Sequence, residues 1–319
     1  MKKQFLFRLS FLAVFAVLLC FLYLTYQTHG NLNFALQIRG RKLIAFILVS
    51  IAVSFATVTF QTMTQNHFLT PNILGYDSLY VVIQTLLFFF IGGVTMLSQE
   101  TLSMFFANIL LMTLVSLLLS KFLLKRSQNN LFLLLMIGMI LGTLFSSLST
   151  FLQVLMDPNE YDLLQGRLFA SFGNINGNHL IWATVIIVLG AALLMKLSPY
   201  LDVLHLGNDQ ATNLGIQVSR FQTLLFAIIS LLTGTATALV GPITFLGFIA
   251  ANISYQLTRT YLHRWLFLTS TLIGIILLVG GQFLVEQVFA LNATLSVVIE
   301  FVGGIYFVGK IVHERKKTA

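Results

Sequence analysis

Long apolar runs recur along the chain from Phe5 to Val312, and short polar intervals separate them. The hydrocarbon core of a membrane is about 30 Å thick, so a helix that rises about 1.5 Å per residue needs about 20 apolar residues to cross it. The pattern therefore predicts an all-α polytopic membrane protein with about ten transmembrane helices. Counts of nine or eleven helices are also compatible with it. The Ile243–Leu257 run is short for a span, which favours a partial helix or one packed against protein. The predicted segments are Phe5–Tyr26, Leu43–Met63, Leu79–Leu97, Leu102–Leu123, Leu131–Leu152, His179–Leu197, Phe221–Val240, Ile243–Leu257, Trp265–Val288 and Leu295–Val312.

The composition excludes a soluble globular protein. Of the 319 residues, 57% are hydrophobic and 9% are charged, whereas roughly 25% are charged in an ordinary soluble domain. Because the apolar runs extend from end to end, we expect one transmembrane domain over residues 1–319, surrounded by membrane lipid. The net charge of +8 would suggest a nucleic-acid partner in a soluble protein. Here the basic residues lie in short caps between apolar runs, so no nucleic acid is expected.

The positive charges orient the predicted helices. With a cytoplasmic N-terminus and ten crossings, fourteen Lys and Arg residues fall on the cytoplasmic side and four fall outside, which satisfies the positive-inside rule. Both termini are then cytoplasmic. Three of the outer four, Arg39, Arg41 and Lys42, form a basic cluster just before the second helix. Composition alone favours a snorkelling cap at a helix end, and the alternative is a docking point for an acidic external partner.

Signatures of an enzyme or a metal site are nearly lacking in the sequence. Cys20 is the only cysteine, and the six histidines are scattered over different loops and helices. The Gly304–Ile311 stretch has the spacing of a phosphate-binding loop, but Ile311 replaces the hydroxyl residue that would hold magnesium, and the stretch lies in an apolar helix. We therefore expect no catalytic residue, no metal ligand and no cofactor in this chain. If the activity of the protein costs energy, another subunit must bind the ATP.

The polar interval between the sixth and seventh apolar runs, about residues 204–216, has signals for a short helix. Asn208 and Asp209 can cap such a helix, and Gly215 can end it. The interval is either a plain linker or a rigid element on which a cytoplasmic partner pushes.

Four segments resemble the iron-siderophore/cobalamin permease family of ABC importers, often called the FecCD family. The polar interval is similar to that family's L-x-L-G-x-x-x-A-x-x-L-G, and Gly241–Ile249 is similar to its G-P-I-x-F-V-G-L-I. The segment from Gln61 through Asn66 to Gly75 has the spacing of Q-x4-N-P-L-A-x-P-x-x-L-G, and Gly303–Phe307 is similar to G-A-P-F-F. The matches follow the family's order from about residue 39 to the C-terminus.

The resemblance implies a type II ABC importer permease architecture in a bacterial cytoplasmic membrane. It also implies four kinds of partner: two ATP-binding subunits that hold ATP and Mg, a second permease copy or a paralogue, an extracytoplasmic substrate-binding protein, and a ferric-siderophore cargo. A haem or cobalamin permease of the same family is the alternative. From another class, the alternative is an ion-coupled secondary transporter.

The resemblance also assigns residues. It places Arg39 and Lys42 on two arginines that face the binding protein in relatives, so the cluster with Arg41 becomes the expected docking site. A charge inside the last apolar run costs about 2.5–3.5 kcal/mol, so Glu300 lies either on the pathway or an interface, or is protonated or hydrogen-bonded near a helix end. We group Gln61 and Asn66 with it as pathway or interface residues. The expected ATPase-coupling residues are Leu204, Leu206, Gly207, Asp209, Ala211, Leu214 and Gly215.

Two further features bear on packing and specificity. Gly138 and Gly142 form a small-x-x-x-small pattern that is typical of close helix packing. His67 and Ile305 replace prolines of the family motifs, which weakens any transfer of substrate specificity.

Overall fold

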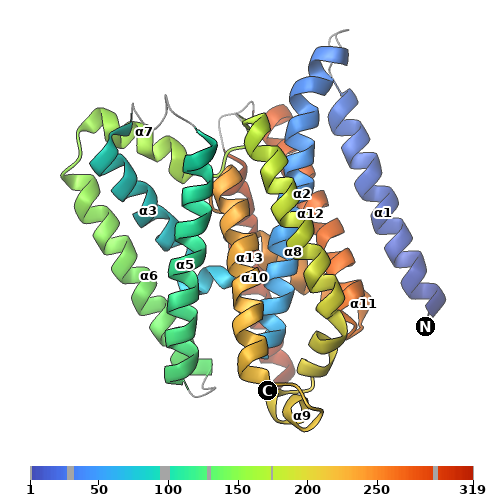
Figure 1. The fold of residues 1–319 in the computed structure, drawn as a ribbon. Helices are drawn as coiled ribbons and strands as arrows, with labels where there is room; N and C mark the ends of the chain where they lie inside the picture. The colour runs from blue at the N-terminus through green and yellow to red at the C-terminus, as the bar shows by residue number, and fades with distance from the viewer. Residues whose placement is uncertain are drawn as a thin grey trace.

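The computed structural model describes residues 2–26, 32–93, 101–127, 131–173, 175–289 and 294–318, and the regular structure in these ranges is helical. The helices stand roughly side by side, and both chain ends lie on the side of α9, opposite α7 (Figure 1). The long and medium helices are α1 (Lys2–Thr25), α2 (Leu32–Thr64), α3 (Tyr76–Ile91), α5 (Leu102–Ser127), α6 (Leu131–Val154), α8 (Gly177–Leu204), α10 (Val218–Val240), α11 (Leu246–Thr258), α12 (His263–Gln287) and α13 (Leu295–Thr318). The short ones are the 3-10 helix η1 (Pro71–Leu74), α7 (Pro158–Leu168) and α9 (Asn208–Asn213).

Each of the ten predicted apolar segments overlaps a helix. Within the described ranges, seven helices are long and apolar enough to cross a membrane, namely α1, α2, α6, α8, α10, α12 and α13. α3 and the described apolar part of α5, Leu102–Leu118, are shorter. The predicted third segment extended to Leu97, but α3 ends at Ile91, where Gly92 takes φ 89. Residues 94–97 of that prediction lie outside the described residues.

α11 is the short segment whose partial character the sequence indicated. It has 13 residues, and it begins after a break in the helix at Gly241, where φ is 95. Most of its side chains are buried, and a Cβ on Gly247 would clash with Thr57 of α2. Backbone that is not helical is tolerated at membrane depth only where protein or a water-filled cavity surrounds it. The interpretation of α11 as a partial helix packed against protein is therefore confirmed.

α2 forms the centre of the bundle and packs against α8, α10, α11 and α12. Large aromatic side chains fill these contacts, and the Phe55 ring of α2 stacks on Phe267 of α12 with the ring centres 4.2 Å apart. α3, α5, α6 and α7 gather on one side of this centre, and α1 stands at the other edge (Figure 1).

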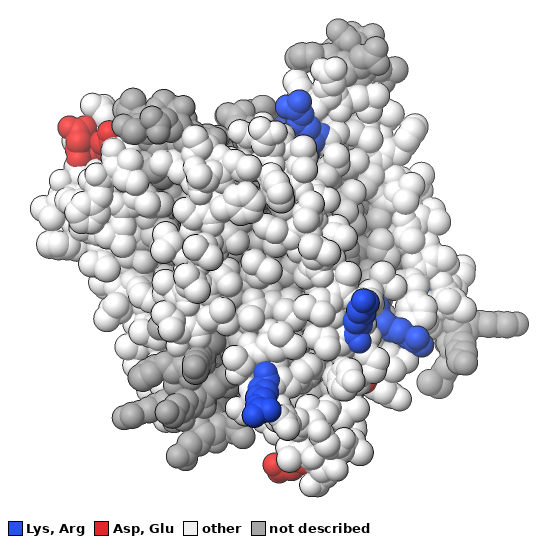
Figure 2. Space-filling view, in the orientation of Figure 1, with Lys and Arg blue, Asp and Glu red and all other residues white. Residues whose placement is uncertain are grey.

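The outer surface is apolar. In the apolar 18-residue stretch of α1 only 6% of the residues are buried, and the Phe7 side chain is 71% exposed. Charged side chains on the visible face lie toward its upper and lower ends, with an uncharged surface between them (Figure 2). An exposed apolar surface of this extent matches a lipid environment, so the chain is a multi-pass membrane protein.

Candidate functional site

The segment predicted to couple to a cytoplasmic partner forms α9, between α8 and α10. Gly207 is the N-cap residue of α9, with φ 109, and as a glycine it has no side chain that could cap the helix. Its carbonyl accepts the N–H of Ala211 at 3.0 Å. The prediction that Asn208 or Asp209 caps this helix is wrong, because the chain turns one residue earlier, at a glycine that adopts a positive φ without steric cost.

The end of α9 agrees with the sequence. Gly215 takes φ 88, its N–H donates to the Thr212 carbonyl at 2.9 Å, and the N–H of Ile216 donates to the Ala211 carbonyl at 3.0 Å. This pair of bonds satisfies carbonyls that the helix leaves unpaired. The prediction that Gly215 ends the helix is confirmed.

The expected coupling residues divide between an inner and an outer face of this segment. Leu204 and Ala211 are fully buried, whereas Leu206 and Leu214 are 55% and 64% exposed, and Asp209 is exposed as well. α9 lies beyond the ends of the long helices, on the side of the chain termini (Figure 1). The segment is thus anchored from within and offers leucines on both sides of α9 to the outside.

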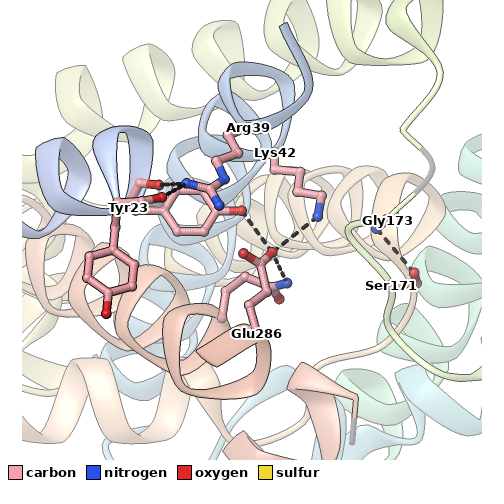
Figure 3. Close-up of polar contacts among 8 residues, drawn as sticks. Tyr23, Arg39, Lys42, Ser171, Gly173 and Glu286 are labelled. Atoms are coloured by element: carbon pink, nitrogen blue, oxygen red, sulfur yellow. Dashed lines mark hydrogen bonds and ion pairs between the residues drawn. The ribbon is translucent and has the colours of Figure 1, made fainter. Parts of the chain in front are cut away.

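In the basic cluster of Arg39, Arg41 and Lys42, Arg39 binds the end of α1. Its guanidinium donates to the carbonyls of Tyr23 and Tyr26 at 3.0 and 2.6 Å, and it lies 5.7 Å from the centre of the Tyr23 ring (Figure 3). A cation at this position satisfies the last carbonyls of a helix and opposes its dipole.

Lys42 is also engaged inside the subunit. Its ammonium lies 3.2 Å from the Glu286 carboxylate of α12, which also accepts from the Tyr23 hydroxyl at 3.2 Å and the Gln282 amide at 2.8 Å (Figure 3). Arg41, by contrast, is exposed and has no hydrogen-bond partner in the part of the chain that the structure describes. Of the three predicted docking residues, Arg41 is the one available to an external partner.

Glu300 lies beside a second acidic residue. The Thr244 hydroxyl lies 3.0 Å from the Asp77 carboxylate and 3.4 Å from that of Glu300. Since one hydroxyl donates one hydrogen at a time, the two carboxylates share a single donor. Asp77 is in the first turn of α3, Thr244 lies in the break before α11, and Glu300 is exposed on α13. An exposed carboxylate in an apolar helix indicates a surface that protein or water covers.

Gln61 lies in the last turn of α2, and Asn66 lies in the turn that follows this helix. The Gln61 amide donates to the His67 carbonyl at 2.7 Å, and the Asn66 side chain accepts the Phe68 N–H at 2.8 Å. These bonds stabilise the turn, and in the described part of the chain no hydrogen bond joins either residue to Glu300. The structure therefore groups Gln61 with Asn66, but not with Glu300.

Sequence reasoning missed Asp77, Asp202, His263 and Glu286. Each has a polar partner on another segment of the bundle, far away in the sequence. The available signal was an ionisable residue within or at the end of an apolar helix, which is costly unless it is paired.

Comparisons with known proteins agree with the resemblance. The FecCD transport family model matches residues 5–313. The chain is 42% identical to the petrobactin import system permease protein YclO of Bacillus subtilis, over 97% of this chain and 98% of that protein. It is 36% identical to the petrobactin import system permease protein FatC of Bacillus anthracis, over 86% and 77% of the two chains.

A solved structure has the same fold. A metal-chelate type ABC transporter in an inward-facing conformation superposes with a TM-score of 0.84, at 23% identity, over 97% of this chain and 99% of the other. The predicted permease architecture is therefore confirmed, and the chain belongs to the FecCD transport family.

Proposed function

We propose that the chain is the membrane-spanning permease subunit of an ATP-driven importer that carries a ferric siderophore across the bacterial cytoplasmic membrane. The observation that carries this proposal is the identity of 42%, over almost the full length of both chains, to a petrobactin import permease. Matches at 26–30% identity to ferric enterobactin and iron(3+)-hydroxamate import permeases favour an iron chelate over haem or cobalamin. A molybdate import permease matches at 28%, well below the petrobactin relatives.

The importer pairs this chain with a second permease. FatC and FatD of Bacillus anthracis are both petrobactin import permeases, and they match this chain at 36% and 29% identity. Two different permeases that serve one siderophore favour a paralogue as the partner, and a second copy of this chain is the alternative.

The two sides of the molecule serve different partners. Two ATP-binding subunits engage the segment around α9, and they rather than this chain bind ATP and Mg and hydrolyse the ATP. In this assignment α9 and both termini are cytoplasmic. The substrate-binding protein docks on the opposite side, where Arg41 is exposed.

Reconstitution tests this function. Liposomes that contain the chain, its paralogue and the ATPase should accumulate radioactive iron when the binding protein presents ferric petrobactin. They should do so only when ATP is present on the side of the membrane that carries the ATPase. Unlabelled ferric petrobactin should compete, whereas haem and cobalamin should not. Accumulation driven by a sodium or proton gradient without ATP would establish the secondary-transporter alternative instead.

A further inference from the structure

A chain of buried and part-buried hydrogen bonds joins α8, α12 and α2 next to the end of α8, directly before α9. The Asp202 carboxylate, near the end of α8, lies 2.6 Å from Nδ1 of His263 and accepts the backbone N–H of the same residue at 2.7 Å. On the other side of the ring, Nε2 of His263 lies 2.6 Å from the Thr62 hydroxyl of α2. The His263 side chain is fully buried.

Asp202 supplies the cap that α12 lacks. α12 begins at His263, and its N-cap residue Leu262 has no side chain that can accept a hydrogen bond. The first N–H groups of a helix need such an acceptor, and a negative charge there opposes the helix dipole. Because this acceptor comes from α8, a shift of the end of α8 acts on the start of α12.

Hydrogen bonds at both nitrogens hold the His263 imidazole in one orientation. A carboxylate only accepts, so Asp202 holds the proton of His263 on Nδ1. Nε2 then accepts the hydrogen of the Thr62 hydroxyl, which is no longer available to the Val58 carbonyl 3.0 Å away in α2. Both ring nitrogens are thus bound to other helices, and the ring can neither flip nor rotate without leaving a buried polar group unpaired, which is costly.

A second contact joins the end of α8 directly to the end of α2. Gln65, which takes φ 52 just after α2, donates its amide to the Leu204 carbonyl at 2.8 Å and to the Thr62 carbonyl at 2.9 Å. Leu204 is the last residue of α8 before the α9 segment.

The bonds continue beyond α2. The His67 carbonyl accepts from Gln61 of α2 at 2.7 Å and from Asn252 of α11 at 3.1 Å. Asn252 in turn accepts from Lys310 of α13. These contacts, two residues beyond Gln65, join the end of α2 to α11 and to α13, the helix that carries Glu300.

We infer that Asp202, His263 and Thr62 form the link through which movement of the α9 segment reaches α12 and α2, with His263 as the positioning residue. This inference rests on the proposed function, because it takes α9 as the surface that the ATPase moves. Apolar side chains at a helix contact can slide past one another, whereas short, directional bonds between buried groups hold the helix ends in register. A physical link of this kind requires a demonstrated coupling between its members.

The test uses the complete importer with its paralogue, ATPase and binding protein. Thr62→Val removes the hydroxyl at constant shape, and Asp202→Asn replaces an acceptor with an amide that cannot fix the ring proton in the same way. Each variant should import roughly tenfold less ferric chelate per ATP hydrolysed, within the usual range of coupling between sites. Basal ATP hydrolysis and co-purification of the ATPase should be retained. The double variant should lose no more than the worse single variant, since both changes break one link.

Two matched variants separate coupling from folding. Thr62→Ser keeps the hydroxyl and should restore import per ATP. Thr64→Val lies two residues further along α2, is also buried, and removes a hydroxyl that bonds only within its own helix, so it should behave as wild type. Unchanged import per ATP in Thr62→Val and Asp202→Asn, or losses that multiply in the double variant, would overturn the inference while leaving the proposed function intact. An ATPase that does not co-purify with the wild-type permeases would instead overturn the proposed function.

Discussion

At the scale of single residues, charges that are adjacent in the sequence have different surroundings. Arg39 and Lys42 are held by the end of α1 and by Glu286, whereas Arg41 between them is exposed. The sequence predicted one basic cluster with one role. Glu286, which separates these roles, lies more than 240 positions further along the chain.

Arg41→Glu should weaken binding of the substrate-binding protein. An exposed charge acts mainly on the association rate, so we expect about a tenfold slower association at low salt and a smaller effect at high salt. Surface-immobilised importer and soluble binding protein would give both rates. Arg220→Glu, an equal change of charge at an exposed site near α9, is the control. Equal association rates for Arg41→Glu and wild type would rule out docking through this residue.

Glu286→Gln should lower stability rather than docking. The amide keeps the shape but leaves the Lys42 ammonium, whose side chain is 17% exposed, without its counter-charge. We expect a loss of about 1–2 kcal/mol in the free energy of unfolding, measured by denaturation in detergent. Asp209→Asn, at an exposed carboxylate on α9, should leave stability unchanged. A Glu286→Gln variant as stable as wild type would show that this ion pair contributes nothing net.

At the scale of elements, helix breaks place the functional segments. α9, η1 and the start of α11 each follow a break, and glycines with positive φ stand at Gly75, Gly207, Gly215 and Gly241. Sequence reasoning found the end of α9 because a glycine after a helix is a strong local signal. It did not find the start, because Asn208 and Asp209 are equally good N-cap candidates in the sequence. In the structure the chain turns at Gly207, which takes the N-cap position instead.

The exposed leucines beside α9 belong to this scale. The double variant Leu206→Glu/Leu214→Glu places charges where the proposed ATPase contact is apolar, and we expect at least a tenfold loss of co-purified ATPase, as for central residues of an interface. Leu155→Glu, at a leucine that is 59% exposed beside α7, makes the same change on the opposite side and should retain the ATPase. Full retention by the double variant would move the ATPase contact away from α9.

The glycine pattern of α6 makes a close contact with the start of α3. A Cβ on Gly142 would already be in van der Waals contact with Cα of Gly75, at 3.5 Å, so the methyl groups that a valine adds beyond it would crowd this contact. Gly142→Val should therefore push α6 away from α3 and cost about 1–3 kcal/mol of stability, as overpacking does. Gly166→Ala, where an added Cβ meets nothing within 4 Å, is the control in the same unfolding assay. Equal stability of Gly142→Val and wild type would show that this contact relaxes freely.

At the scale of the whole molecule, one carboxylate stands on the apolar surface of the subunit. Glu300 is exposed on α13 among apolar neighbours such as Phe301, which is 69% exposed. A carboxylate facing lipid at this depth would cost about 2.5–3.5 kcal/mol. Contact with a second permease or with water in the pathway would lower this free-energy cost, which agrees with the proposed pairing.

Glu300→Leu separates these environments. If protein or pathway water covers Glu300 in the complete importer, the variant should raise the thermal stability of the subunit expressed alone and lower chelate uptake by the complete importer at least fivefold, about 1 kcal/mol. Val308→Leu, at a site that is 60% exposed on the same helix, should change neither. Raised stability together with normal uptake would mean that Glu300 faces lipid or its headgroups in the importer.

The sequence by itself determined what depends on local chain properties: the apolar segments, the partial character of α11, the end of α9, and the family. Hydrophobic length and glycine conformation are encoded within a few neighbouring residues. Only the tertiary structure decided which polar groups meet. Asp202 with His263, Lys42 with Glu286, and Asp77 with Glu300 around Thr244 each join helices far apart in the chain. Hydropathy does not determine the rotation of a helix about its axis, so it cannot say which side chains face each other across a helix contact.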